Sequence, residues 1–329
     1  MIFIKRIKYK NIVPKFERIK KNYSRQLIHL AIVILLFIAN LNIITLKRMN
    51  GALKYINQNQ SNNYKAKCYI PIDEPKIKLI HIIITRFMIE FLSDFKNKIY
   101  NENYIKNGIR VMKKYLFKAL ENQSCKDFYF IIRLGNKANI TYIRSLLNLN
   151  LSFKFEVIYD KDIKNFIRNM TKGYDVLITT RIDYDDIIYY DAVNDVRKAI
   201  NINKPMLVYG YNRGSFYFES NRKFYDFYNS FGNKGAMSVF ESLIVVLNQV
   251  NDTYNIHDMG NHPVVRKNIM ENYKSYGIKK LNYDPGIFDS GDPKFVWVRQ
   301  KFSGLYNDSI NRRSYLIEKP FSLSKFSGN

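Results

Sequence analysis

The longest uninterrupted apolar stretch of the chain lies near its N-terminus. Residues 27–46 read LIHLAIVILLFIANLNIITL and contain no Asp, Glu, Lys or Arg. About 20 apolar residues span a bilayer as a helix. A stretch that is apolar on all sides does not suit a surface helix with one buried face. We therefore expect a transmembrane helix over 27–46, with a helix buried in a protein core as the alternative.

From Lys76 onwards the pattern changes to short apolar segments that alternate with helical spacing. Helical spacing marks 109–120, 163–170 and 191–200. Strands alternating with helices form parallel sheets, and the ligands of such sheets bind beyond the carboxyl ends of the strands. The pattern therefore predicts an α/β domain. Its expected strands are compact segments rich in β-branched residues, at 78–85, 127–134, 155–160, 174–180 and 205–211.

The segment between the apolar stretch and this domain has little apolar periodicity. It includes NQNQSNNY and ends in PIDEP, a composition typical of a stem or linker. The pattern thus divides the chain into a basic arm (1–26), a transmembrane helix (27–46), a stem (47–75), a folded domain (76–310) and a peripheral tail (311–329).

The net charge of +25 is spread unevenly over these segments. Residues 1–67 carry 14 Lys/Arg and one acid, whereas the other 262 residues carry 39 Lys/Arg and 27 acids. Eight Lys/Arg precede the apolar stretch in 6–25 and four follow it in 47–66. The positive-inside rule then places the N-terminus in the cytoplasm and the domain across the membrane. RNA binding is the alternative for the arm, but few aromatic residues are interleaved there, so no nucleic acid is expected.

The most informative motif follows the fourth predicted strand and reads TTRIDYDD (179–186). Asp183 and Asp185 share a face on extended backbone, and carboxylates this close repel one another unless a cation or protons intervene. A divalent cation removes this conflict and can stabilise a nucleotide diphosphate as a leaving group. Arg181 is placed to assist at a phosphate oxygen. A solvated acidic turn is the alternative.

Two motifs about ninety residues apart, HIIITRF (81–87) and TTRIDYDD (179–186), resemble the bacterial rhamnosyltransferase family, a branch of the GT-A type nucleotide-sugar glycosyltransferases. WVRQKFSGLYNDS (297–309) resembles the aromatic-rich close of such domains, and the resemblance covers roughly 76–310. It implies a GT-A-like, Rossmann-related mixed sheet flanked by helices.

The resemblance also assigns roles to residues. It implies that Asp183 and Asp185 hold Mn²⁺ or Mg²⁺, that Asp186 orients them, and that Thr85 and Arg86 lie near the donor. The chain departs from the broader GT-A pattern at its second strand. Many relatives have an acid there for the nucleotide base, whereas this chain has Arg133 and Gly135.

Further candidates come from a late loop, NIHDMGNHP. His257 is a candidate metal ligand and Asp258 a candidate general base, while His262 is a weaker ligand candidate. Glu241 is a second candidate base. Its alternative is a capping box with Ser238 at the start of a helix.

Aromatic and cysteine residues complete the set of candidates. Tyr211 and Arg213, at the end of a predicted strand, are expected to contact the acceptor, with core packing as the alternative for the tyrosine. Cys68 and Cys125 have no metal-ligand spacing, and they would form one disulfide if the domain lies in an oxidising compartment.

These observations predict a membrane-anchored, metal-dependent glycosyltransferase of hexosyltransferase type. It would move a sugar, with rhamnose suggested by the resemblance, from a nucleotide-sugar donor to a hydroxyl of a glycan or glycolipid. The expected topology is type II, in the Golgi or ER if the source is eukaryotic and in the inner membrane if it is bacterial. The alternatives are a magnesium-dependent phosphoryl-transfer enzyme and a non-enzymatic membrane adaptor whose basic arm binds lipid or RNA.

Overall fold

The structure is a computed structural model that describes residues 68–69, 77–89, 100–218, 223–228, 240–260, 264–289, 295–299 and 317–318. All of these residues belong to the second of two units, Met1–Asn63 and Tyr64–Asn329. The expected basic arm, the apolar stretch 27–46 and most of the stem therefore lie outside the described residues. Among the helices of the described part, none is both long and apolar enough for a membrane span.

A seven-stranded mixed sheet forms the centre of the described unit. Its strand order is β10-β6-β9-β4-β1-β2-β3. The pairs β3–β2, β2–β1, β1–β4 and β6–β10 are parallel, whereas β9 runs antiparallel between β4 and β6. The strands are β1 (Leu79–Phe87), β2 (Tyr129–Leu134), β3 (Lys154–Tyr159), β4 (Val176–Asp183), β6 (Met206–Tyr211), β9 (Glu241–Val246) and β10 (Gly286–Asp289).

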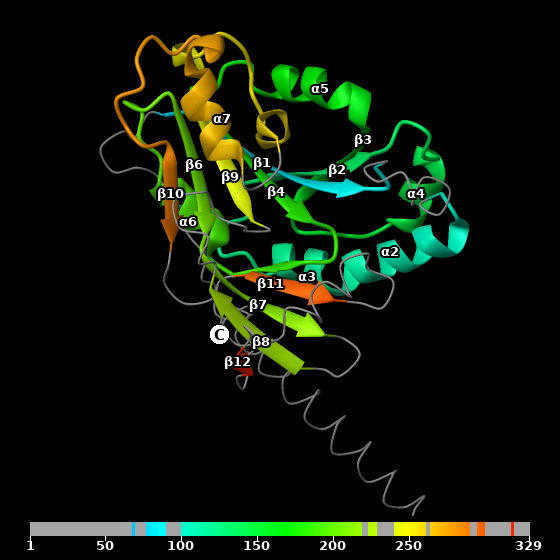
Figure 1. Ribbon diagram of the computed structural model, residues 1–329. Coiled ribbons are helices and arrows are strands. Elements are labelled where there is room, and N and C mark those ends of the chain that lie inside the picture. Colours follow the sequence, from blue (N-terminus) through cyan, green and yellow to red (C-terminus); the bar gives the residue numbers. More distant parts are fainter. Residues whose placement is uncertain are drawn as a thin grey trace, which may run out of the picture. The chain divides into compact units, whose positions relative to one another are not determined.

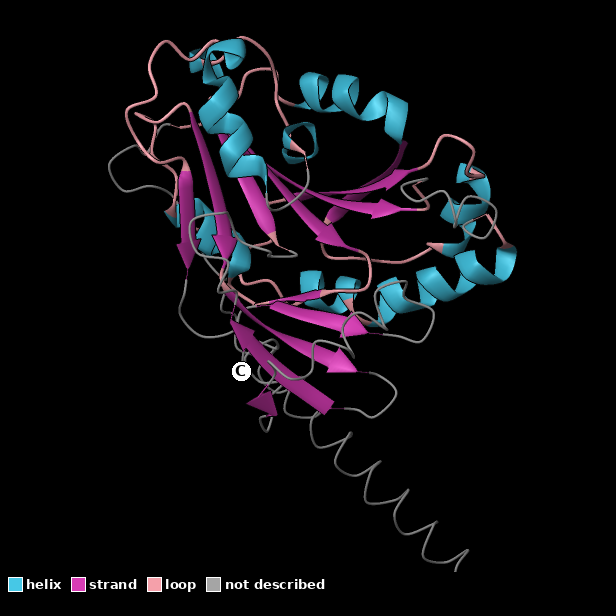
Figure 2. Ribbon diagram, viewed as in Figure 1, coloured by secondary structure: helices cyan, strands magenta, loops and turns pink. Residues whose placement is uncertain are grey.

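Helices cover both faces of this sheet (Figures 1 and 2). Side chains alternate between the faces, so one apolar cluster contains Ile83 of β1 and the other contains Ile82 and Ile84. The first cluster is covered by α2 (Glu102–Lys114), α3 (Leu116–Glu121), α4 (Ile140–Leu146) and α6 (Ala192–Lys198). The second is covered by α5 (Ile163–Met170), α7 (Val265–Asn272) and the 3₁₀ turn η6 (Ile256–Met259); the other 3₁₀ turns are η3 (Asp160–Asp162), η5 (Leu247–Gln249) and η8 (Tyr273–Tyr276).

A smaller sheet of order β12-β8-β7-β11-β5 packs beside α2. Tyr217 of β7 lies 6.4 Å from Tyr115, between the ring centroids, in an edge-on contact. Val111 and Tyr115 form the small buried cluster at this contact. The strands are β5 (Ile187–Ile188), β7 (Arg213–Phe218), β8 (Lys223–Tyr228), β11 (Phe295–Arg299) and β12 (Ile317–Glu318).

The five predicted strands are confirmed as β1, β2, β3, β4 and β6, and the predicted helices as α2 with α3, α5 and α6. The first helical stretch is interrupted at Tyr115, where α2 ends and α3 begins. The suggestion that Glu241 follows a helix cap is wrong. Glu241 opens β9, whose six side chains are all buried, so its continuous apolar run reflects a strand covered on both faces.

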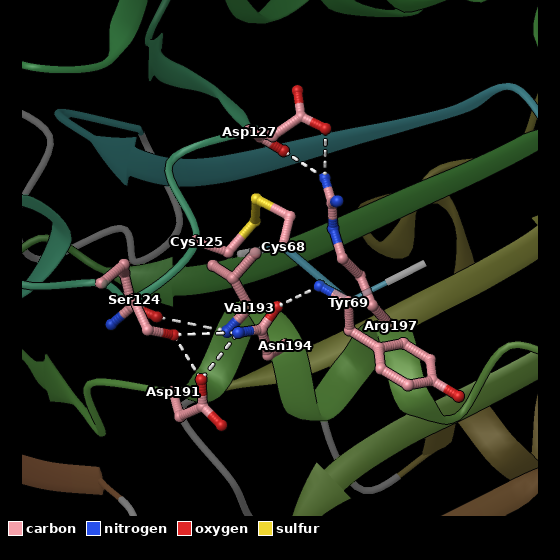
Figure 3. Close-up of a disulfide and its surroundings, with 10 residues drawn as sticks. Cys68, Tyr69, Ser124, Cys125, Asp127, Asp191, Val193, Asn194 and Arg197 are labelled. Atoms are coloured by element: carbon pink, nitrogen blue, oxygen red, sulfur yellow. Dashed lines mark hydrogen bonds and ion pairs between the residues drawn. A yellow bond between two sulfur atoms is a disulfide. The ribbon is translucent and has the colours of Figure 1, made fainter. Parts of the chain in front are cut away.

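The chain enters the fold at the amino edge of the sheet, defined here as the edge at which the parallel strands begin. Cys68 forms a disulfide with Cys125, which lies just before β2 (Figure 3). The Tyr69 backbone N–H donates to Asn194 Oδ1 of α6 at 2.9 Å. Asn194 Nδ2 in turn donates to Ser124 Oγ at 3.0 Å (Figure 3). The segment before β1 is therefore held to both β2 and α6.

Candidate active site

Three side chains lie in one row across the carboxyl edge of the sheet, where the parallel strands end. Arg86 of β1 is in register with Arg133 of β2 on one side and with Asp183 of β4 on the other. All three belong to the sheet face that η6, α5 and α7 cover, because they alternate with residues of the other cluster. Arg86 and Asp183, which the two sequence motifs contribute, therefore lie beside one another on adjacent strands.

The pairing within this row is open to solvent. Arg86 Nη2 lies 3.4 Å from Asp183 Oδ1, and the two side chains are 27% and 41% exposed. Such a pair contributes about 1 kcal/mol or less. Arg133 forms an ion pair with Asp160, which follows β3. The row thus presents two neighbouring guanidinium groups beside the Asp183 carboxylate. Both Arg86 and Asp183 are partly exposed to solvent.

The acidic motif forms a fixed turn after β4. The Asp186 N–H donates to the Asp183 carbonyl at 3.2 Å, and the Asp186 side chain is buried. Tyr184 packs edge-on against Phe87, with 5.2 Å between ring centroids. Burial, together with the negative charge of Asp185, raises the Tyr184 pKa well above its usual value. Asp183 and Asp185 are partly exposed, so the turn offers two carboxylates to solvent while its third is enclosed.

Arg181 and Glu241 form a buried ion pair between β4 and β9. Their side chains are 3% and 1% exposed. Arg181 Nη1 also donates to the Gly260 carbonyl at 2.7 Å, which ties the segment after η6 to the sheet. Burial lowers the Arg181 pKa, against the opposing effect of Glu241. The expectations of Arg181 at a substrate phosphate and of Glu241 as a base are therefore corrected, because both side chains are buried and paired with one another.

The turn η6 lies against β4 and carries two of the candidates. The Ile256 N–H donates to Thr179 Oγ1 at 2.8 Å. Asp258 Oδ2 accepts from the Asn255 N–H at 3.0 Å, closing the capping box that forms the turn. Desolvation raises the Asp258 pKa, although hydrogen bonds from Asn255 and the charge of Lys164 oppose the shift. His257 is partly exposed on the same turn, whereas His262 lies outside the described residues.

Three further candidates lie elsewhere. Thr85 is fully buried and belongs to the opposite face of β1 from Arg86. Tyr211 is 1% exposed, donates through its hydroxyl to Asp195 Oδ2 at 3.1 Å, and stacks on Phe240. Its predicted contact with an acceptor is corrected to core packing. Arg213 is partly exposed at the start of β7, in the smaller sheet.

No cluster of three or more His, Cys, Asp or Glu side chains in the described residues is arranged to hold a metal ion. Asp183 and Asp185 remain as two partly exposed carboxylates on one turn. Mg²⁺ is commonly held by one or two carboxylates together with substrate phosphates. The residues present therefore fit a metal that arrives with a phosphorylated substrate, and they do not form an all-protein metal cage.

The Arg133–Asp160 pair was missed in the sequence. Its signal was present, since the two residues end consecutive strands and parallel strand ends meet at one edge. Gly135, which departs from the GT-A pattern, has a steric reason: any side chain there would collide with the Met88 carbonyl. Met88 itself has a φ of 56°, so the chain turns sharply where β1 ends beside β2.

No protein-family model matches the chain, and no curated protein sequence matches it. Similar solved structures include an inositol-1-phosphate CTP transferase from T. maritima, with 6% identity, a TM-score of 0.32, and coverage of 73% of this chain and 98% of that one. Another is a Bacillus anthracis protein assigned as a glucose-1-phosphate thymidylyltransferase, with 12% identity, a TM-score of 0.34 and coverage of 75% and 98%. HddC from Yersinia pseudotuberculosis has 14% identity, a TM-score of 0.31 and coverage of 67% and 92%. At these values the similarities do not establish a function.

Proposed function

We propose that the chain is a membrane-anchored, metal-dependent glycosyltransferase. It transfers a sugar, with rhamnose as the first candidate, from a nucleotide-sugar donor to a hydroxyl of a glycan or glycolipid. One observation carries this proposal: Arg133, Arg86 and Asp183 lie in one row at the carboxyl edge, beside the turn that exposes Asp185. Cations and carboxylates in a row match a diphosphate and its counter-ion.

The two arginines supply the diphosphate contacts. Arginine binds phosphate oxygens with paired, charge-assisted hydrogen bonds. The contact of Arg86 Nη2 with Asp183 is long and partly exposed, so the phosphate oxygens of a bound donor would compete with Asp183 for this guanidinium. Asp183 and Asp185 would hold Mn²⁺ or Mg²⁺, which when bound stabilises the negative charge on the departing diphosphate.

A general base is needed if the reaction inverts the anomeric configuration. Asp258 is the remaining candidate, since Glu241 is buried against Arg181. A raised pKa makes a carboxylate a better proton acceptor near neutral pH, and desolvation shifts Asp258 in that direction. Asp258 would take the proton of the acceptor hydroxyl. Its hydrogen bonds to Asn255 hold the carboxylate in place.

The disulfide supports the proposed type II topology. Disulfides persist in oxidising compartments and are rare in the cytosol. Cys68 and Cys125 are both in the unit that follows the expected membrane span. Protection of this unit from protease in sealed membranes, with Cys68 and Cys125 unreactive to maleimide until a reductant is added, is the expected result.

The enzymatic test uses the full chain in membranes with a panel of nucleotide sugars. We expect release of the nucleoside diphosphate that depends on Mn²⁺ or Mg²⁺. Asp183→Ala or Asp185→Ala should reduce it by roughly a thousandfold, since metal stabilisation of a leaving group is worth several kcal/mol. Glu271→Ala on α7, an exposed carboxylate paired with Lys267, is the matched control. Absence of turnover with every donor, with or without metal, would overturn the proposal.

A further inference from the structure

Lysines gather at the amino edge of the sheet, opposite the candidate site. A lysine opens or precedes each of its six parallel strands: Lys78 (β1), Lys126 (β2), Lys154 (β3), Lys172 (β4), Lys204 (β6), and Lys279 with Lys280 (β10). Lys279 and Lys280 line a cavity of about 520 Å³ together with Asn203, Asn248 and Tyr283. This cavity lies beside the segments that precede β6 and β10.

Most of these lysines have no acidic partner in the described part of the chain. Lys78, Lys154, Lys172, Lys279 and Lys280 are exposed and form no ion pair there. Lys126 is different, because it is partly buried and donates to backbone carbonyls of α3, and desolvation lowers its pKa to about 8.

The acids of this edge are engaged elsewhere. Asp252 pairs with Lys164 and Arg168 of α5, Asp127 pairs with the buried Arg197, and Asp284 pairs with Arg266. The Asp175 side chain accepts from the backbone N–H of Lys78, at 2.9 Å. None of these four acids forms an ion pair with an amino-edge lysine in the described residues, and Asp175 keeps its negative charge beside Lys78.

An exposed aromatic side chain lies among these lysines. Tyr174, 40% exposed, follows Lys172 in the turn before β4. Gly173 has a φ of +82°, which fixes this turn without a side chain of its own. In the described residues Met270 of α7 is the other large exposed hydrophobic side chain. Tyrosine and tryptophan are enriched where membrane proteins meet the headgroup level of a bilayer.

The chain also enters the fold at this edge. The disulfide and the Tyr69–Asn194 hydrogen bond hold the start of the described unit beside the beginning of β2. The stem between residues 46 and 68 has 21 residues. A membrane anchor at 27–46, joined to the folded unit by this stem, would hold the unit at the bilayer at high effective concentration.

We propose that the amino edge, through Lys78, Lys172, Tyr174, Lys279 and Lys280, docks on a membrane surface of anionic lipid headgroups. This inference rests on the membrane anchor of the proposed function. The parallel strand β4 spans 8 residues, or roughly 25 Å, so docking turns the carboxyl edge away from the bilayer by about that distance. The acceptor is then a glycan hydroxyl held well above the membrane, and not one close to a lipid headgroup.

The test places a reporter at the docking surface of the full chain. Tyr174→Trp in a Trp297→Phe background gives a single tryptophan at the amino edge. Its fluorescence is measured in bilayers of brominated zwitterionic lipid with and without phosphatidylserine. Backbone hydrogen exchange of 171–176 is measured in the same bilayers for the unmodified chain and for the substituted chain, and equal exchange in the two shows that the substitutions have not altered this turn.

We expect strong quenching and slowed exchange only with the anionic lipid. A lysine near an anionic surface favours binding about fivefold. The combined change Lys78→Gln, Lys172→Gln, Lys279→Gln and Lys280→Gln should therefore lower the ratio of docked to undocked molecules at least tenfold. The control removes four exposed lysines elsewhere: Lys106→Gln on α2, Lys267→Gln on α7, and Lys137→Gln with Lys161→Gln beyond β2 and β3.

Three results would overturn docking. They are equal quenching with and without anionic lipid, an equal loss in the control variant, and protection of 171–176 by added RNA in place of lipid. Extraction of the full chain by alkaline carbonate would show separately that the anchor fails. Release of nucleoside diphosphate, measured on the same membranes, reports on the transferase proposal independently of either.

Discussion

The two edges of the central sheet carry different kinds of charge. At the carboxyl edge, arginines and aspartates face one another in register, as Arg86 faces Asp183. At the amino edge, exposed lysines such as Lys172 have no carboxylate partner among the described residues. Arginine presents a planar group that fits a phosphate in a set orientation, whereas lysine is a mobile point charge. The first edge is suited to bind one substrate in one geometry, and the second to meet a broad anionic surface.

The two edges thus use the basic residues of the chain in two different ways, which the net charge alone does not show. The folded unit carries excess lysine and arginine, for which codon bias is one explanation. Codon bias, however, does not account for a lysine that opens or precedes each of the six parallel strands of one sheet. Position in the fold, and not the count of charges, separates the two roles.

The strongest stability test separates the buried ion pair of the carboxyl edge from the exposed one. Arg181→Met leaves Glu241 charged and enclosed, so it should lower the free energy of unfolding by about 3–5 kcal/mol. Arg86→Met breaks a partly exposed pair and should cost about 1 kcal/mol or less. Urea unfolding measures both. Recovery of most of the loss in Arg181→Met with Glu241→Leu would show that the uncompensated charge is the cause, and equal losses for Arg181→Met and Arg86→Met would contradict it.

At the amino edge, the disulfide is expected to make a large contribution to the free energy of unfolding. Cys68→Ala with Cys125→Ala should lower the free energy of unfolding by roughly 2–4 kcal/mol, because the bridge closes a long loop. The two cysteines are 57 residues apart in the sequence. The same loss is expected on reducing the unmodified chain. An unchanged urea midpoint after reduction would mean that the stem segment is not held to the amino edge.

A smaller effect is expected from His81, which lies within the sheet between the two edges. Its Nε2 is 2.7 Å from Thr180 Oγ1, and burial holds its pKa well below the usual value. The folded state then keeps His81 neutral while the unfolded state takes up a proton below about pH 6.5. Stability should fall as the pH drops through this range, by up to about 1.4 kcal/mol per pH unit.

Unfolding at pH 7 and pH 5.5 measures this dependence. In His81→Leu, the free energy of unfolding should depend less on pH over this range. A profile identical to that of the unmodified chain would show that His81 is accessible to protons in the folded state, and would weaken the description of the region between the edges as closed core.

The sequence identified the parts of the fold in which local pattern and burial agree. The strands at 78–85 and 174–180 were evident, and so was the acidic motif at the carboxyl end of the second of them. The strand β9 was missed because a short apolar run, LIVVL at 243–247, fits a buried helix or a buried strand equally well. Its antiparallel place between β4 and β6 depends on long-range pairing, which no local pattern records.

The candidate site shows the same limit. Spacing brought out Asp183 and Asp185, but it did not show that Arg181 faces Glu241 instead of a ligand, since that depends on which strand lies beside β4. Tyr211 had the composition of an acceptor contact and lies in the core. The amino-edge lysines could not be recognised as a group in the sequence, because they are spread over 203 residues, from Lys78 to Lys280. They come together only when the strands pair in the sheet.

The central claim is that the carboxyl edge, and not the amino edge, binds a nucleotide diphosphate. Calorimetry of the full chain with UDP, GDP and dTDP, with and without Mn²⁺, tests it directly. We predict that at least one of them binds only with the metal, that Asp183→Ala abolishes this, and that Arg86→Gln weakens it about tenfold, as expected for a lost charge-assisted hydrogen bond. Binding should be unchanged in the variant lacking Lys78, Lys172, Lys279 and Lys280. Binding of none of the three with metal, or an equal loss in the lysine variant, would contradict the claim.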